Sequence, residues 1–449
     1  MRWQSNKFRV LQFLLFILVI FTFFGTDNYS SRDRVVRNER RRAVHFTQLS
    51  MLAQVVFGMT DLRDGNMGHP SARFLVISQK NLRFHCRFPS GVEAVGQVYP
   101  FSENHNMQYG IYYVSCEIPK NELFFKHVEV SEESAASWVQ VSIEHTIPDD
   151  RGILDHKFDY GICVPMLYGT KYSAKHLIEF MELNSLLGAE RVTIYTPGQP
   201  LASDLQEVFN YYANLGMLEE IEMVIPGNFT QLWYHGQLAA ISDCLLRHTA
   251  MAKYVAFHDL DEFLIPMQKT NVVEVLKKKL TGNVGSLRVP TRYMSSEPEV
   301  NTGLITLQNF NHGPIPDKIF TKCVLRPDMV FEQGIHHTSR VIQDIYGIHS
   351  ANINDLMLYH YKKRGSDKSL KQVLLVLDIN MTPKALLIFL VFYAAIAVSM
   401  AHSPVQRTQC DYSCQHHVQD SPADCCRRLG FRTGHCTMFW FKERAWCND

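Results

Sequence analysis

The chain has 449 residues, of which 46% are hydrophobic and 20% are charged, and its formal net charge is +1. This length and apolar content predict at least two folded units, each with its own core. A nearly neutral chain lacks the concentrated basic surface of nucleic-acid-binding proteins, so we expect no nucleic-acid partner.

The first apolar segment lies at the N-terminus. Residues 10–24 are almost wholly apolar and follow three basic residues. This pattern predicts a transmembrane signal-anchor over residues 8–24, with residues 1–7 as a cytoplasmic tail and the remainder in the lumen of the secretory pathway. The apolar run is shorter than a usual membrane span, so a cleaved signal peptide is the alternative.

Two regions of different character follow the apolar segment. Residues 25–70 contain a dense run of arginines and little periodic apolar pattern, which predicts an exposed stem. From residue 71 to residue 150, short alternating apolar runs are separated by Gly, Pro and Asn, a pattern typical of a β-rich accessory domain. Cys86 and Cys116 both fall at strand-like positions, where either a disulfide or two buried thiols would fit.

Strands and helices alternate from residue 155 to about residue 370. Strands are predicted at 160–167, 191–195, 221–224 and 254–258, and helices at 173–187, 201–215 and 236–248. This alternation predicts an α/β domain in which a mainly parallel sheet is flanked by helices and ligands bind at the carboxyl ends of the strands.

An acidic cluster directly follows the last of these strands. Asp259, Asp261 and Glu262 lie between two apolar runs, where unpaired acids are costly. Two carboxylates one residue apart can both face a cation where the backbone turns, and Mn²⁺ or Mg²⁺ prefers carboxylate and diphosphate oxygens. A metal held there would offset the charge that develops on a departing nucleoside diphosphate. The Asp-x-Asp triplet also occurs by chance in solvated loops, so its position at a strand end carries the functional interpretation.

The acidic cluster belongs to a longer pattern that resembles glycosyltransferase family 92 over residues 155–365. The matching segments are Gly236-Gln237, Asp243-Cys244, the run from Tyr254 to Pro266, Cys163-Val-Pro165, Glu179-Phe180, Arg326-Pro327, Gly334-Ile-His336 and His360-Tyr361. The resemblance implies a GT-A-like fold and a single-pass type II membrane protein of the Golgi with a luminal catalytic domain. It also implies an inverting, metal-dependent transfer of galactose from UDP-galactose, in β1,4 linkage, to a glycan or glycoprotein acceptor.

The resemblance assigns roles to residues of the cluster. Asp259 and Asp261 correspond to the motif that binds the metal, Mn²⁺ or Mg²⁺, and the diphosphate of the UDP-sugar donor. Glu262 corresponds to a supporting ligand or a loop-ordering acid. His336 is the expected third metal ligand because neutral imidazole suits such an ion, whereas His337 is expected to be an ordinary loop histidine.

Four further residues are candidate substrate contacts by their position in the fold. They are Pro165 and Tyr168 at the end of the first strand of the α/β domain, and Gln237 and Asp243 in the third helix.

Inversion at the anomeric carbon requires a general base near the acceptor hydroxyl. Asp317, Asp328, Glu332 and Asp344 all follow the metal motif and could serve. We favour Glu332, which lies close to His336 in the sequence, and retain Asp317 as the second catalytic candidate. A metal-dependent hydrolase of the secretory pathway is the alternative function, since such enzymes also gather Asp and His at strand ends.

The C-terminal residues have the organisation of a separate secreted peptide. Residues 381–401 contain, in order, a Met, a Lys, an apolar run and small residues, as in a signal peptide. Six cysteines then crowd residues 402–449, which predicts a disulfide-rich tail. We expect residues 381–449 to be a fused secreted peptide without a part in catalysis; a second transmembrane helix is the alternative for its apolar run.

Three N-glycosylation sequons agree with a secretory-pathway protein. They begin at Asn28, Asn228 and Asn380, and Asn228 is the candidate glycosylation site within the α/β domain.

Overall fold

The computed structural model describes residues 42–63, 70–122, 124–135, 137–145, 156–167, 172–229, 231–294, 304–308, 320–361, 435–438 and 445–448. These residues fall within one compact unit, Glu39–Asp449. The predicted anchor (8–24), the apolar segment 381–401 and most of the cysteine-rich tail lie outside them. Among the described residues, no helix is long and apolar enough to cross a membrane.

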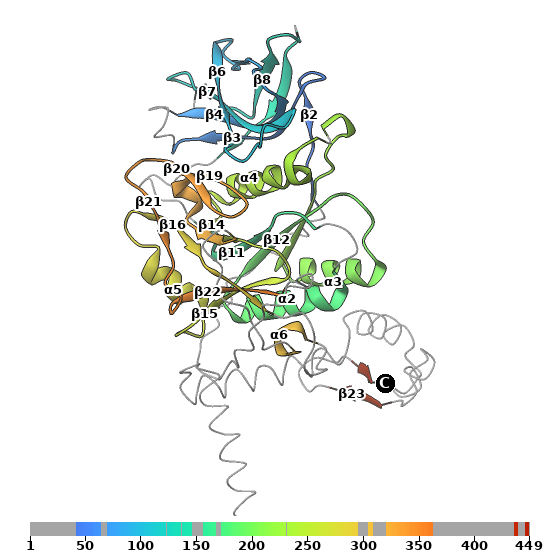
Figure 1. The fold of residues 1–449 in the computed structure, drawn as a ribbon. Coiled ribbons are helices and arrows are strands. Elements are labelled where there is room, and N and C mark those ends of the chain that lie inside the picture. The colour runs from blue at the N-terminus through green and yellow to red at the C-terminus, as the bar shows by residue number, and fades with distance from the viewer. Residues whose placement is uncertain are drawn as a thin grey trace, which may run out of the picture. The chain divides into compact units, whose positions relative to one another are not determined.

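An eight-stranded sheet forms the centre of the α/β domain (Figure 1). Its strands are β1 (Arg42–Ala43), β11 (Phe158–Val164), β12 (Arg191–Thr196), β13 (Leu218–Glu222), β14 (Ala252–Phe257), β16 (Val284–Val289), β18 (Lys322–Leu325) and β21 (Gly347–Ser350). They lie in the order β1-β13-β12-β11-β14-β18-β16-β21. β18 runs antiparallel to β14 and β16, and the other described neighbours are parallel. The prediction of a mainly parallel sheet is confirmed.

Helices cover both faces of this sheet. They are α2 (Ala174–Leu186), α3 (Ser203–Asn214), α4 (Gln237–His248) and α5 (Val272–Lys279). Figure 1 shows α4 on one side of the sheet and α2 and α3 on the other. Ser173 forms a capping box with His176 at the start of α2, and the Asn271 side chain accepts a hydrogen bond from Val273 N–H at the start of α5. These caps fix where the two helices begin; α2 agrees with the helix predicted at 173–187, whereas α5 was not predicted.

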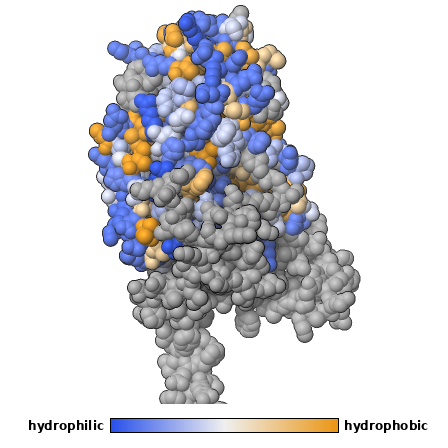
Figure 2. All heavy atoms as spheres, viewed as in Figure 1, coloured by the Kyte–Doolittle hydropathy of each residue, from blue (hydrophilic) through white to orange (hydrophobic). Residues whose placement is uncertain are grey.

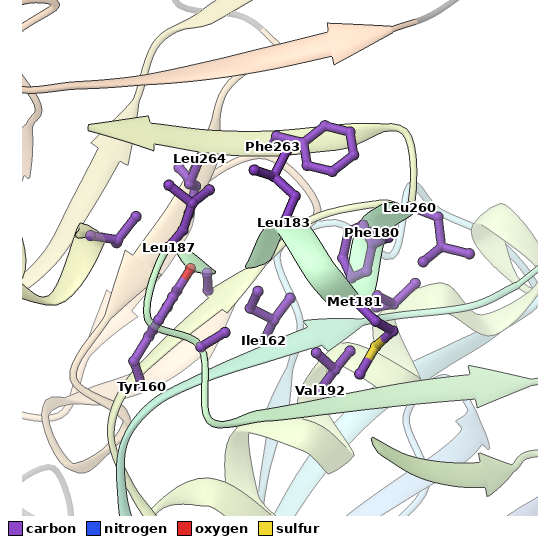
Figure 3. Packing of buried hydrophobic residues seen from close by; sticks show 14 of the residues in the cluster. Tyr160, Ile162, Phe180, Met181, Leu183, Leu187, Val192, Leu260, Phe263 and Leu264 are labelled. Carbon is purple, nitrogen blue, oxygen red and sulfur yellow. The ribbon is translucent and has the colours of Figure 1, made fainter. Parts of the chain in front are cut away.

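Alternate residues of the strands supply two separate cores. Ile162 of β11 packs with α2 and α3, whereas its neighbour Cys163 faces the core that contains α4. In the first core, Phe180 and Met181 of α2 lie over Ile162 and Val192 (Figure 3). Leu260 and Phe263 belong to the same core, and each such buried side chain contributes about 1.5–3 kcal/mol. The residues that flank the acidic cluster are therefore anchored in the hydrophobic core.

A three-stranded sheet receives the chain immediately after the acidic cluster. It consists of β15 (Glu262–Pro266), β22 (Leu356–Tyr361) and β17 (Thr291–Met294), in the order β15-β22-β17. The antiparallel register of β15 and β22 places Glu262 opposite His360. Two shorter strands, β19 (Val330–Gln333) and β20 (Thr338–Val341), pair with each other.

The accessory domain is β-rich, as predicted. Its nine described strands are β2 (Thr47–Gln48), β3 (Ala53–Asp61), β4 (Ser71–Gln79), β5 (Phe84–Arg87), β6 (Glu93–Pro100), β7 (Tyr109–Glu117), β8 (His127–Glu132), β9 (Val139–Ser142) and β10 (Glu144–His145). A disulfide between Cys86 and Cys116 joins β5 to β7, so of the two alternatives left open by the sequence the structure has the disulfide.

The predicted stem extends too far toward the C-terminus. Residues 42–63 are folded, and every residue of β3 is buried. Because β3 is covered on both faces, its sequence lacks the alternation that marks a half-exposed strand. β1 is also structured: it adds a parallel edge strand to the α/β sheet beside β13, where Arg42 pairs with Glu219 at 3.2 Å.

On the face of the molecule drawn in Figure 2, hydrophilic side chains predominate and hydrophobic ones form small separate groups.

In the described part of the tail, β23 (His435–Met438) and β24 (Ala445–Asn448) form an antiparallel pair. Their register places Cys436 opposite Cys447.

Candidate active site

The order of the strands locates a binding edge between β11 and β14. The chain runs outward through β11, β12 and β13 and then returns to place β14 on the other side of β11. Ligands of open α/β sheets bind outside the carboxyl ends of the strands at such a reversal. Pro165 follows β11 and Asp259 follows β14 at this edge. The sequence therefore placed the acidic cluster at the position that the topology favours.

Glu262 orders the turn that carries the acidic cluster. Its Oε2 accepts a hydrogen bond of 2.8 Å from the backbone N–H of Asp259. The Nζ of Lys322, from β18, lies 3.3 Å from Asp259 Oδ2 and 3.5 Å from Glu262 Oε2. Burial alone would lower the pKa of Lys322, but the two carboxylates raise it, so the amine is protonated. The Asp259 side chain remains 31% exposed and can reach a ligand.

His360 and Tyr172 close the other side of the cluster. His360 Nδ1 lies 3.2 Å from Glu262 Oε1, and its Nε2 lies 3.7 Å from Asp261 Oδ1. Tyr172 is hydrogen-bonded to Asp261, and burial together with the neighbouring carboxylates raises the pKa of the Tyr172 phenol. Burial also raises the pKa of Glu262, although Lys322 opposes the shift. Asp261 thus lies in a polar shell built from three separate parts of the chain.

Lys322, His360 and Tyr172 were not predicted as site residues. His360 belongs to a segment that matches the family pattern, and this was the available signal for it. Nothing adjacent to Lys322 or Tyr172 in the sequence marks either as a partner of the acids, because strand pairing and the packing of α2 bring them there.

The two adjacent histidines face different partners. His336 Nδ1 lies 3.2 Å from the carbonyl oxygen of Thr321, and its ring packs edge-on against Phe320. Burial, followed by the charge of Lys322, lowers the pKa of His336 to about 4, so the imidazole is neutral and can act as a ligand. His337 is 41% exposed, and its Nδ1 lies 3.4 Å from Glu103 Oε1 of the accessory domain.

In the described part of the chain, the ligand atoms of Asp259, Asp261 and His336 do not all lie within 4.8 Å of one another. The group there whose ligand atoms lie within 4.8 Å of one another is Cys163, Cys244 and His248. The two sulfurs of that group are joined in a disulfide between β11 and α4, a pairing that was not predicted. The metal assignment to the acids and His336 therefore stays a prediction.

The geometry gives Glu332 a structural role in place of the predicted role as base. Glu332 is fully buried and accepts hydrogen bonds from Tyr99 Oη at 2.6 Å and from Ser102 N–H and Oγ at 2.9 and 2.7 Å. A carboxylate surrounded by these donors of the accessory domain has no access to an acceptor hydroxyl. We therefore no longer propose Glu332 as the general base.

Two of the other candidate bases lie at the end of the sheet opposite the acidic cluster. β18 runs antiparallel to β14, so Asp328, which follows β18, lies beyond the amino end of β14 and away from the acidic cluster. Asp344 precedes β21, whose first residue pairs with the first residue of β16 at that same distant end. Asp317 lies outside the described residues, and it remains the candidate base.

The residues predicted to contact the substrate lie in different surroundings. Pro165 is buried at the end of β11, Gln237 begins α4, and Tyr168 lies outside the described residues. Asp243 is fully buried and accepts hydrogen bonds of 2.7 Å from Tyr195 Oη and Arg247 Nε. Asp243 therefore ties α4 to β12, and its fully buried side chain presents no surface to a nucleotide.

A cavity of about 440 Å³ opens at the carboxyl ends of β11, β12 and β13. It is lined by Met166, Pro197, Gln199, Met223, Val224, Ile225 and His235. The backbone of its wall before α4 is strained, since Tyr234 and His235 have φ of 45° and 52°. Strained backbone of this kind clusters at active sites and ligand-binding segments. The cavity also lies along the same edge of the sheet as Asp259.

The candidate glycosylation site lies in a short 3-10 helix. Asn228 is in η1 (Gly227–Phe229), and Thr230 of its sequon lies outside the described residues. Its modification remains a prediction.

The fold and the site define a class: an α/β enzyme with an acidic cluster and a cavity at the carboxyl edge of its sheet. The sequence profile of glycosyltransferase family 92 matches residues 158–385, about half of the chain. The chain belongs to glycosyltransferase family 92, and it is a glycosyltransferase. The match begins close to the predicted boundary and continues beyond residue 365 into the first residues of the segment 381–401.

Known relatives agree with this family. The chain is 35% identical over 357 residues to the "Beta-1,4-galactosyltransferase galt-1" of Caenorhabditis elegans, an alignment that covers 75% of this chain and 83% of that protein. It is 25% identical over 215 residues to the "Galactan beta-1,4-galactosyltransferase GALS3" of Arabidopsis thaliana, covering 46% of this chain and 41% of the relative. Among solved structures, residues 1–349 of TarS from S. aureus match with a TM-score of 0.30 and 12% identity, over 45% of this chain and 60% of that one.

Proposed function

We propose that this glycosyltransferase is a metal-dependent, inverting enzyme with a GT-A-like fold that transfers galactose from UDP-galactose to a glycan acceptor in β1,4 linkage. The observation that carries the proposal is the ordered acidic turn of Asp259, Asp261 and Glu262 at the reversal point of the sheet. Family membership supports glycosyl transfer, and the names of the relatives from C. elegans and A. thaliana support galactose and the linkage.

In this proposal, two regions of the edge would receive the two ends of a nucleotide-sugar. The cavity has apolar walls that include Met166, Met223 and Ile225, together with the polar side chains of Gln199 and His235. Such a lining suits a planar base that also needs a few hydrogen bonds. Asp259 lies along the same edge after the neighbouring strand, so a donor bound in the cavity would extend its diphosphate toward the acids.

The charges of the cluster fit a divalent cation. Three carboxylates gather there, and Lys322 is the ammonium that faces two of them. Asp259 and Asp261 would hold Mn²⁺ or Mg²⁺, and the neutral imidazole of His336 would complete the set. When bound, the ion would offset the charge on the leaving diphosphate. Glu262 keeps the turn in shape through the N–H of Asp259, and His360 holds Glu262 from the other side.

We also propose a luminal location in the Golgi, with type II membrane anchoring through residues 8–24. Two disulfides, Cys86–Cys116 and Cys163–Cys244, support an oxidising compartment because such bonds persist in the secretory pathway. Glycosylation of Asn228 would accompany that location.

A product assay tests the proposed reaction. The purified chain is incubated with a panel of UDP-sugars, with and without a β-galactoside acceptor, and both free sugar and extended glycan are measured. The proposal expects extended glycan from UDP-galactose and little free galactose when the acceptor is omitted. Release of free sugar at the same rate without acceptor would support the hydrolase alternative, and transfer of a different sugar would overturn the donor assignment.

A further inference from the structure

The segment that carries His336 is a tight turn between β19 and β20. Gly334 N–H donates to the carbonyl oxygen of His337 at 2.8 Å. The side-chain amide of Gln333 donates to the carbonyl oxygens of Gly334 and His337 at 2.8 and 3.1 Å. These bonds set the shape of the turn, but its place in the protein depends on what holds it from outside.

Glu103 of the accessory domain holds this turn on both sides of His336. Its Oε2 accepts a hydrogen bond of 3.1 Å from Ile335 N–H, and its Oε1 lies 3.4 Å from His337 Nδ1. The Glu103 side chain is only 13% exposed. A Cβ on Gly334 would overlap the Glu103 carboxylate, so a glycine there is what allows the close approach.

A second contact fixes the strand that leads into the turn. Ser102, next to Glu103, donates through its N–H and its hydroxyl to the buried Glu332 of β19, and Tyr99 donates to the same carboxylate. Charged acceptors of this kind form the stronger class of hydrogen bonds, and a buried one is costly to leave unpaired. One loop of the accessory domain therefore holds the His336 segment at two successive points.

The other side of the turn leads to the acidic cluster. The carbonyl oxygen of His336 accepts a hydrogen bond of 2.6 Å from Thr321 Oγ1, and the His336 ring faces the Thr321 carbonyl. The next residue, Lys322, forms the ion pairs with Asp259 and Glu262. A continuous series of contacts thus joins Glu103 in the accessory domain to the acids.

We propose that Glu103 is a positioning residue: the accessory domain sets the placement of His336 at the metal and donor site through this side chain. The inference rests on the proposed function, because only that function makes His336 a ligand of the metal. It assigns the β-rich domain a part in assembling the active site.

The test measures binding of Mn²⁺ to the full-length chain in the presence of UDP, by electron paramagnetic resonance titration, alongside KM and kcat for the donor. Glu103→Ala should weaken Mn²⁺ binding about tenfold, as loss of the partner that orients a ligand does in other metal sites. Glu103→Gln retains an oxygen that can accept from Ile335 N–H, so it should bind Mn²⁺ within about twofold of wild type. Glu133→Gln is the matched control, since Glu133 is a 54% exposed carboxylate of the same domain whose partner is Arg83.

Three results would overturn the inference. The first is wild-type Mn²⁺ binding by Glu103→Ala, and the second is an equal loss in Glu133→Gln. The third is an equal loss in the Ala and Gln variants, since rescue by the conservative change is what distinguishes positioning from general damage. Should Glu103→Ala fail to fold, Glu103→Asp decides: its shorter side chain should still weaken Mn²⁺ binding several-fold, and unchanged binding would refute the proposal. Absence of Mn²⁺ binding in the wild-type chain would overturn the proposed function as well.

Discussion

Replacing Lys322 by Met tests whether the acidic cluster depends on its internal cation. The Lys322 and Glu262 side chains are 4% and 3% exposed, and Met preserves most of the volume of Lys. Removing one partner of a buried ion pair costs about 3–5 kcal/mol, and because Asp259 is partly exposed to solvent we expect about 3 kcal/mol, the lower end. The loss should appear as a lower urea midpoint of unfolding.

Added Mn²⁺ sharpens this prediction. Without Lys322 the carboxylates lack a counter-charge, so Mn²⁺ should stabilise Lys322→Met more than it stabilises wild type. Ligand at a hundredfold excess over its Kd adds about 2.7 kcal/mol to the free energy of unfolding. Lys277→Met is the control, since Lys277 and Asp159 form an exposed pair at 2.9 Å whose loss should cost less than about 1 kcal/mol. Equal urea midpoints for Lys322→Met and wild type, or a smaller effect of Mn²⁺ on the variant, would refute the reasoning.

Three further predictions concern individual side chains. His336→Ala should raise the Mn²⁺ concentration needed for half-maximal transfer by roughly ten- to a hundredfold, while His337→Ala should change it little; equal effects would point to packing of the turn. Glu332→Gln should retain transfer activity because Glu332 is a structural acceptor, whereas abolished transfer with an unchanged thermal midpoint would restore it as the base. Burial would raise the pKa of Asp61, but its two arginine partners hold it well below its usual range, so Asp61→Asn should be less stable than wild type at neutral pH. That difference in unfolding free energy should shrink as the pH falls below about 4, where the unfolded carboxyl is protonated, and a difference independent of pH would contradict the ion-pair account.

The α/β alternation could be predicted because its signals are local. Ser173 caps α2, and Gly236, with φ of 83°, precedes α4, so the helix starts could be located from single residues. β3 could not be found in this way, since a strand buried on both faces shows no alternation. The order of the strands depends on long-range pairing and was available from the sequence only through the resemblance.

The candidate site likewise combines residues that a local pattern reveals with residues that only the fold brings together. Asp259, Asp261 and Glu262 are adjacent in the chain, so their grouping was visible in the sequence. Lys322 and His360 reach them through the pairing of β18 with β14 and of β22 with β15, and no local pattern encodes those contacts. Closeness in sequence was also an unreliable guide. Glu332 lies four residues before His336, yet its carboxylate accepts hydrogen bonds from Tyr99 and Ser102 of the accessory domain.

The measurement that tests the central claim most directly is galactose transfer by Asp261→Asn, with and without EDTA, beside wild type. Asn keeps the size of the side chain while removing its charge, so the variant should fold and accumulate like wild type. The account predicts that transfer from saturating UDP-galactose is abolished in the variant, is abolished in wild type by excess EDTA, and returns to wild type when Mn²⁺ is restored. Normal turnover by Asp261→Asn, or undiminished wild-type activity in excess EDTA, would contradict a metal-dependent transfer centred on the acidic cluster.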